Sequence, residues 1–131
     1  MDILDIIGPI MVGPSSSHTA GAVRIGLVAR KLLGSTPVRA ELYLHGSFAA
    51  TGRGHGTDMA LIAGLLGFAP DDERIPQSFE YAKKAGLEFR FDTIQLRDAH
   101  PNSVLIKACG AGGHSIEVVG ASIGGGRIEI R

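Results

Sequence analysis

The stretch "VRAELYLHG", residues 38–46, decides the fold class, because apolar and polar side chains alternate along it as in a half-buried strand. Apolar side chains occupy alternate positions and polar ones lie between them: Val38, Ala40, Leu42 and Leu44 against Arg39, Glu41, Tyr43 and His45. A glycine-rich segment follows, and "TDMALIAGLLGF", residues 57–68, then has the pattern of a helix. We expect Thr57 or Asp58 to cap that helix. A strand, a glycine-rich turn and a helix in this order predict helices packed on a sheet.

The segments on either side extend this pattern. Upstream, residues 19–34 predict a helix that ends at Gly34, with Arg24 turned outward. Downstream, residues 77–86 predict another helix, and four short strands are expected at residues 87–96, 103–110, 114–122 and 126–131. Strands connected locally favour antiparallel pairing. The expected class is therefore α+β, a four- to five-stranded antiparallel or mixed sheet with helices packed mainly on one side.

Composition limits the function classes. The chain has 131 residues, 44% of them hydrophobic, which is enough for one domain with a single core. Thirteen basic and thirteen acidic side chains cancel, so nucleic acid and anionic membranes are unlikely partners on electrostatic grounds. No apolar run approaches the length of a membrane span, and a single cysteine, Cys109, fits a reducing compartment. We expect a cytoplasmic protein.

The first candidate site is "GPSSSHTAG", residues 13–21, at the start of the first long helix. A single serine can cap a helix, but Ser15, Ser16, Ser17, His18 and Thr19 exceed that need. The free N–H groups and the dipole at a helix start also attract a carboxylate or phosphate. The segment therefore predicts a pocket for a small anion, with a cap carrying surplus polar residues on an exposed turn as the alternative.

The second candidate site is "GSFAATGRGHGTD", residues 46–58, where a strand again leads through glycines into a helix. Its glycine spacing does not match a dinucleotide fingerprint, and the lysine of a phosphate-binding loop is missing. His55 remains, with Asp58 close enough in sequence to orient the imidazole as a proton carrier. The alternative is that His55 only forms hydrogen bonds within the turn.

These two motifs, together with "HPNS" at residues 100–103 and "ASIGGG" at 121–126, resemble the β chain of the iron-sulfur-dependent L-serine dehydratases. The resemblance covers nearly the whole chain. It implies a two-part enzyme in which cysteines of a partner α chain hold a [4Fe-4S] cluster, while this chain alone binds none. It also implies a fold similar to the serine-binding regulatory domain of some phosphoglycerate dehydrogenases. Family β chains commonly continue into an ACT domain, so we expect residues 1–131 to be a single β-type domain from a longer chain.

The resemblance also implies roles for the residues of both motifs. An open iron on the cluster suits the loss of the serine hydroxyl, and His18 or His55 matches the base that removes the α-proton, the other positioning the substrate. The substrate-binding positions are implied to be Ser15, Ser16, Ser17, Thr19, Gly54, Gly56, Thr57 and Asp58. Which histidine takes the proton is left open.

A second function class is also considered: a non-catalytic regulatory module that binds serine or another anion. The two histidines distinguish the classes, since a sensor needs no proton carrier. Outside the motifs, His45 could reach the cleft or close a turn, His100 is expected to shape a turn, and His114 is expected at the surface. Cys109 is expected to be a packed thiol. In isolation we expect a symmetric homodimer formed through a sheet edge or a helix face.

Overall fold

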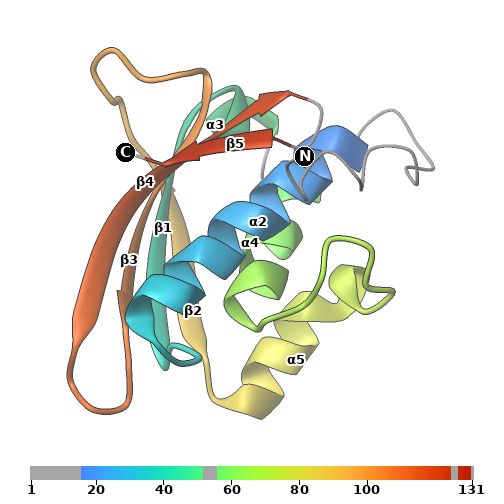
Figure 1. The fold of residues 1–131 in the computed structure, drawn as a ribbon, viewed down its shortest axis with the longest axis vertical. Coiled ribbons are helices and arrows are strands. Elements are labelled where there is room, and N and C mark those ends of the chain that lie inside the picture. The colour runs from blue at the N-terminus through green and yellow to red at the C-terminus, as the bar shows by residue number, and fades with distance from the viewer. Residues whose placement is uncertain (1–15, 52–55, 125–126, 131) are drawn as a thin grey trace.

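The computed structural model describes residues 16–51, 56–124 and 127–130 and shows helices layered against one sheet (Figure 1). The sheet has five strands in the order β2-β1-β3-β4-β5. Their bounds are β1 Arg39–Gly46, β2 Glu88–Thr93, β3 Asn102–Cys109, β4 Ser115–Gly124 and β5 Arg127–Ile130. β1 pairs in parallel with β2, and the other three pairings are antiparallel. The sheet is therefore mixed, because the helical connection from β1 to β2 returns the chain to the same end before β2 begins.

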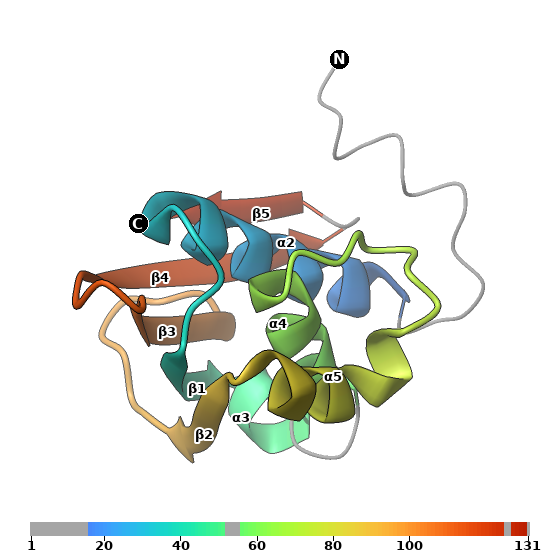
Figure 2. The same ribbon diagram turned by 90° about the horizontal axis from the view of Figure 1, so that it is seen from below.

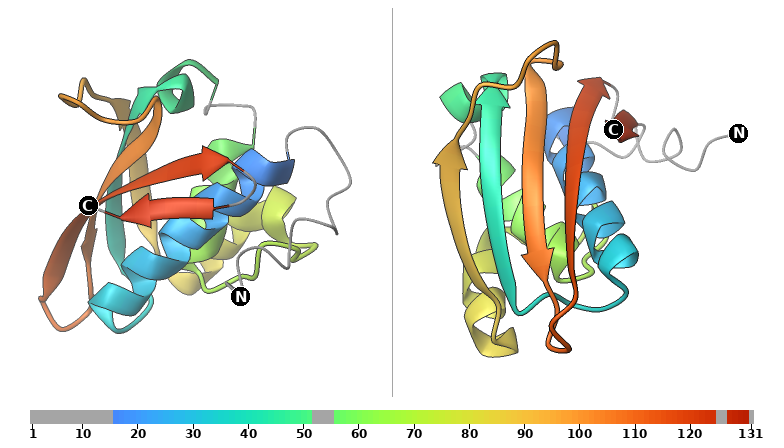
Figure 3. Two further views of the ribbon diagram at one scale, coloured as in Figure 1. Left: turned by 45° about the horizontal axis from the view of Figure 1, so that its top comes forward. Right: turned by 90° about the vertical axis from the view of Figure 1, so that its left-hand side faces the viewer.

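The helices cover one face of this sheet (Figure 2). They are α2 Ser16–Leu33, α3 Ser47–Thr51, α4 Thr57–Leu65, the 3₁₀ turn η2 Ile75–Gln77 and α5 Ser78–Ala85. No described helix lies over the other face, which is bare in the right-hand view of Figure 3. The predicted α+β class, with a mixed sheet and helices on one side, is confirmed.

The core forms where the sheet meets the helices. On β1 the alternation predicted from sequence holds, since Ala40, Leu42 and Leu44 are fully buried while the residues between them face the other way. β3 repeats the pattern with Val104, Ile106 and Ala108 buried. Burial of these side chains removes apolar surface from water and is the main stabilising contribution.

The central helices α2 and α4 contact each other through glycine. A Cβ on Gly64 would meet the carbonyl of Val23 and would lie 2.8 Å from Gly26 Cα. A Cβ on Gly26 would meet the Leu61 carbonyl and lie 2.9 Å from Gly64 Cα. The backbones therefore approach too closely for any side chain. Further along, Gly67, just after α4, lies against Arg30 of α2, so the two helices run in the same direction.

Several boundaries differ from the expectations. The first helix begins at Ser16 rather than at residue 19, and the short helix α3 was not predicted. The predicted cap of α4 is wrong: Thr57 and Asp58 lie within the helix, and Gly56 is the N-cap, with no side-chain cap. Its φ of 96° is a left-handed conformation that favours glycine.

Arg24 is a second correction. We expected it on the outward face of the first helix, but only 4% of its surface is exposed. The physical reason is that α2 is covered on two sides, because Gly26 packs on α4 while Gly21 packs on Ser122 of β4. A helix between two neighbours has a much narrower exposed stripe than a surface helix.

Candidate functional site

The sequence motifs converge at one end of the sheet, which we name the motif end. Its described parts are Ser16–Thr19, Gly46–Thr51, Gly56–Asp58, His100–Ser103 and Ala121–Gly124. The strand register joins three of them, since Gly46 pairs with Asn102 and Ser103 pairs with Ala121. The start of α2 and the short helix α3 lie at the same end, the upper end of Figure 1. Four segments distant in sequence thus become neighbours.

The two long helices both begin at the motif end. Near the start of α2, a Cβ on Gly21 would lie 2.9 Å from Ser122 Cβ, so this part of the helix lies against the last residues of β4. Because α4 runs parallel to α2, its first residue, Thr57, lies at the same end. Two helix N-termini, each with a partial positive charge, are therefore brought together. This arrangement favours a bound carboxylate.

The start of α4 is folded tightly into the protein. Thr57 is 6% exposed and Asp58 7% exposed. Asp58 Oδ1 accepts a hydrogen bond of 2.8 Å from the Met59 N–H, and this carboxylate has further interactions. This burial holds the first turn of α4 in place, because buried polar side chains are held by defined partners.

Two further histidines have structural partners at or beside the motif end. His100 Nδ1 accepts a 3.0 Å hydrogen bond from the Asn102 N–H, and Ser103 Oγ donates to the His100 carbonyl at 2.6 Å, which confirms its predicted turn role. His45 Nδ1 accepts from the Leu96 N–H at 3.0 Å. Because a backbone N–H can only donate, the ring proton of neutral His45 lies on Nε2. His45 therefore fastens the segment after β2.

His114 and Cys109 lie at the opposite end. His114 is exposed, as expected, but its Nε2 donates to the carbonyl of Leu33 at 3.0 Å and so satisfies the last turn of α2. Cys109 pairs with Arg39 at the beginning of β1 and is half-buried. Because Ala108 takes the inward position, alternation turns the Cys109 thiol to the bare face, where it is partly packed.

The other predicted site residues divide into two groups. Ser16, Ser17 and His18 lie in the first turn of α2, where the described part includes their backbone but not their side chains. Ser15, Gly54 and His55 lie outside the described residues, so the roles assigned to these three residues stay predictions. Thr19 follows on α2, half-buried and with an interaction partner.

Sequence reasoning misplaced one charged residue in the middle of α2, the buried Arg24. A charged residue in a helix is assigned to the solvent face by default, so periodicity gave no reason to place it inside. The available signal was the pair Gly21 and Gly26, which flanks it and marks close approach on two sides of the helix. Arg24 adds a buried cation with interactions of its own.

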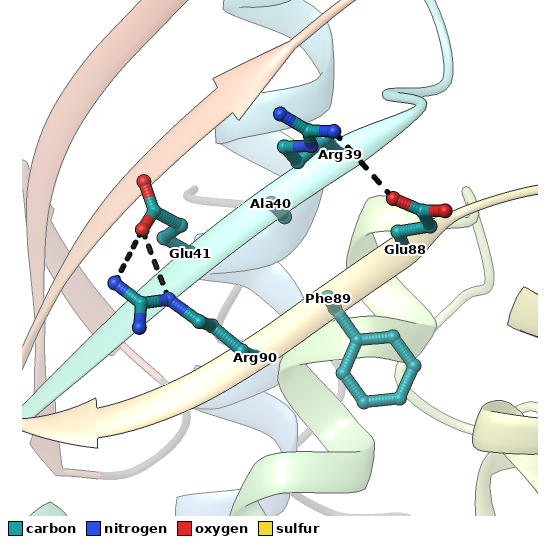
Figure 4. A pocket seen from close by; sticks show the side chains of 6 residues that line it. All are labelled: Arg39, Ala40, Glu41, Glu88, Phe89 and Arg90. Carbon is teal, nitrogen blue, oxygen red and sulfur yellow. Dashed lines mark hydrogen bonds and ion pairs between the residues drawn. The ribbon is translucent and has the colours of Figure 1, made fainter.

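The hollows in the described surface are shallow. One is lined at the motif end by Gly46, Ala49, Ala50, Thr93, Ile94 and Gln95. Another spans the beginnings of β1 and β2, where Arg39 pairs with Glu88 and Glu41 with Arg90 (Figure 4). The described residues contain no group of three His, Cys, Asp or Glu side chains that could hold a metal ion. None of the described helices combines the length and apolarity needed to cross a membrane.

Known proteins match this chain closely. A family described as serine dehydratase beta chain matches residues 2–86. The "L-serine dehydratase, beta chain" of Peptoniphilus asaccharolyticus is 54% identical over 127 residues, which are 96% of this chain and 57% of that protein. The "Probable L-serine dehydratase, beta chain" of Bacillus subtilis (strain 168) is 50% identical over 128 residues, 98% of this chain and 58% of that protein.

A third relative differs in proportion. The "L-serine dehydratase 2" of Escherichia coli (strain K12) is 43% identical over 77 residues, which are 54% of this chain but 16% of that protein. This chain thus spans rather more than half the length of the two beta chains and a small part of a much longer protein.

Proposed function

Because this chain belongs to the serine dehydratase beta chain family, we propose that it is the β subunit of an L-serine ammonia-lyase, which converts L-serine to pyruvate and ammonia together with an iron-sulfur α chain. The observation that carries the proposal is the motif end. There the strand register and the parallel course of α2 and α4 gather every motif of the resemblance around two helix starts.

The proposed substrate, L-serine, has a carboxylate, an amino group and a hydroxyl group, and the motif end is suited to bind the carboxylate. The carboxylate of serine is an anion, and the starts of α2 and α4 provide backbone N–H groups with the positive end of two dipoles. Ser15, Ser16, Ser17 and Thr19 add hydroxyl donors in the proposal. Arg24 adds a positive charge on the same helix. Together they fix the α-carbon in position.

The proton transfer falls to His18 or His55 in this proposal. A neutral imidazole takes the α-proton as the β-hydroxyl leaves as hydroxide, which gives 2-aminoacrylate. The imidazolium then gives up its proton, the hydroxide becomes water, and hydrolysis of the aminoacrylate yields pyruvate and ammonia. Imidazole suits this role because its unperturbed pKa lies close to neutral pH. Thr57 and Asp58, buried at the start of α4, hold the segment that follows His55.

The cluster belongs to the partner in this proposal, because the described residues of this chain do not fit it. They contain no group of three potential ligands, and the chain's single cysteine, Cys109, lies at the opposite end of the sheet from the motif end. The word "beta" in the names of two relatives, and the longer Escherichia coli protein, support a second part.

The test is reconstitution. The chain is co-expressed without oxygen with a cysteine-bearing α chain from the same genome, and pyruvate is measured after addition of L-serine. We expect pyruvate only when both chains are present. Binding of serine by this chain with no pyruvate under any pairing would instead favour the regulatory module.

A further inference from the structure

The face of the sheet opposite the helices is open and carries an ordered pattern of charge. Figure 3 shows this face without a helix over it. Since Ala40, Leu42, Val104 and Ile106 point into the core, their neighbours in β1 and β3 point outward. We name this surface the open face; its central residues are Glu41, Tyr43, Arg90, Asp92, Leu105, Lys107, Glu117 and Val119.

One row across four strands alternates in sign. Glu41 pairs in register with Arg90 on one side and with Lys107 on the other, and Lys107 pairs with Glu117. From β2 to β4 the row therefore reads plus, minus, plus, minus. The Arg90–Glu41 pair is in direct contact, 2.6 Å from Nη2 to Oε2 (Figure 4). This hydrogen bond, with a second from Tyr43, lowers the pKa of Glu41 and so favours its charged form.

A row of even length with alternating signs is complementary to itself under a two-fold rotation. We propose that the open face binds the open face of a second copy of this chain, about an axis that runs along the strands between β1 and β3. This rotation reverses the order of the row. Arg90 then faces Glu117 of the second copy, and Glu41 faces Lys107 of the second copy. Both contacts occur twice, and each joins opposite charges.

The sign pattern opposes two other simple arrangements. An axis across the strands through this row would place each residue opposite itself, so that like charges would face one another. An axis shifted by half the strand spacing, onto β1, would place Arg90 opposite Lys107. Like charges held together across an interface oppose association. An axis between β1 and β2 also pairs opposite charges, Arg90 with Glu41, but overlaps only two strands. The axis that bisects the row pairs all four strands, and a tilt of about 15° gives the crossing of about 30° usual for packed sheets.

The neighbouring row supplies apolar contact on three strands, while its member on β2, Asp92, carries a charge. Tyr43 pairs in register with Leu105, which pairs with Val119. The same axis places Tyr43 of one copy on Leu105 of the other, at the centre of the interface. Four strands of about eight residues cover about 19 by 26 Å, or about 1,000 Å² for both copies, the lower bound for a specific interface. We therefore expect a dimer with a Kd on the order of micromolar.

A second copy fits better than an unrelated partner because the complementarity is internal to one chain. Among the described residues, Lys107 and Glu117 form no ion pair within 4.0 Å, although both are exposed. Their charges are thus available to a facing surface. The sequence suggested a dimer through a sheet edge or a helix face; the open face replaces both as the proposed surface.

The experiment uses two charge-reversal variants: each should dimerise weakly alone, and the two together should form a heterodimer. In Lys107→Glu, Glu41 faces a glutamate in the partner copy; in Glu41→Lys, Lys107 faces a lysine. Each variant alone should raise the Kd at least about tenfold by sedimentation equilibrium. Mixed in equal amounts, they should form a heterodimer, because all four facing pairs are again opposite in sign. Thermal unfolding confirms that each variant is folded.

Further variants keep the test decisive if either reversal fails to fold. Leu105→Lys removes the apolar centre and should also give a monomer, whereas Lys84→Glu, on α5 and away from the open face, should leave the Kd unchanged. A wild-type chain that stays monomeric at about 1 mM overturns the proposal. The proposal is also overturned if Lys107→Glu and Glu41→Lys each dimerise alone with the wild-type Kd, or if the open face binds the α chain and not a second copy of this chain. No activity is measured, so this result is independent of the proposed function.

Discussion

The middle of the α2–α4 helix pair and its first turns differ in the side chains that they carry. In the middle, Gly26 and Gly64 bring the two backbones so close that no side chain fits between them. At the start, hydroxyl and imidazole side chains are concentrated in residues 15–19, and Thr57 and Asp58 begin α4. The glycine contact in the middle sets the distance between the helices, and this distance determines how far apart the polar first turns lie. Substitutions in the two regions should therefore have separable effects on stability and on activity.

The largest expected effect is on catalysis. His18→Ala and His55→Ala are assayed in the reconstituted two-chain enzyme. Loss of the general base should lower kcat by a factor of about 10² to 10⁴, and the variant of the other histidine should show a raised KM. Both variants should unfold at the wild-type temperature, because both histidines lie in polar stretches of the sequence. Near-normal turnover of both variants would contradict the proposed roles and favour the binding module.

The next effect is on stability. Gly26→Ala and Gly64→Ala each place a methyl group against the backbone of the other helix, so the helices must move apart. We expect the free energy of unfolding to fall by about 3 kcal/mol, the upper range for overpacking, because backbone cannot rotate away as a side chain can. Denaturant unfolding measures it.

A matched glycine provides the control for the helix contact. In Gly112→Ala the new methyl would lie 3.4 Å from the His114 ring, an ordinary contact, and stability should change by less than about 0.5 kcal/mol. Equal decreases in the free energy of unfolding for Gly26→Ala and Gly112→Ala would show that the close helix contact does not cause the loss of stability.

The sequence predicted the elements of this fold well where the pattern is local. The alternation along β1 needed only its own residues and was confirmed, and the helix predicted at residues 57–68 is present as α4, Thr57–Leu65. The position of Arg24 and the inward side of β3 depend on which elements lie on either side, which a single-sequence pattern does not contain. The cap of α4 was missed because the left-handed φ of Gly56 ends the preceding segment without any capping side chain.

The site was predicted in composition but not in geometry. The histidine and serine motifs drew attention as local sequences, yet their approach depends on the register of Gly46 with Asn102 and on the parallel helices. His45 shows the limit, because its sequence position equally suited the cleft and a turn. The structure shows a third role: the Leu96 N–H, 51 positions away, donates to His45 Nδ1, so His45 holds the segment after β2.

A smaller effect tests the first turn of α2 as a carboxylate clamp. Ser16→Ala should raise KM for L-serine about tenfold with little change in kcat, since a hydroxyl donating to a charged group contributes about 1.5 kcal/mol to binding. Ser35→Ala, in the exposed turn after α2, is the matched control and should leave both constants unchanged. A fall in kcat at constant KM would instead place Ser16 in the chemical step.

The smallest effect comes from the turn after α4 and asks whether the separation of stability from activity extends there. Asp72 accepts hydrogen bonds from Arg74, 2.6 Å from Nη2 to Oδ2, and the guanidinium stacks 3.9 Å above the Phe68 ring. The hydrogen bonds from the Arg74 side chain and N–H lower the pKa of Asp72 from 3.8 to about 2. A lowered pKa stabilises the folded state above the unfolded pKa, and this stabilisation is lost as pH falls from about 4 to about 2.

Asp72→Asn should therefore unfold at a lower denaturant concentration than wild type at pH 6, with the difference closing by pH 2, while activity at neutral pH stays unchanged. Arg74→Met, which removes the partner, should show the same closing difference; a gap that stays constant between pH 6 and pH 2 would mean that the carboxylate charge has no part in holding this turn.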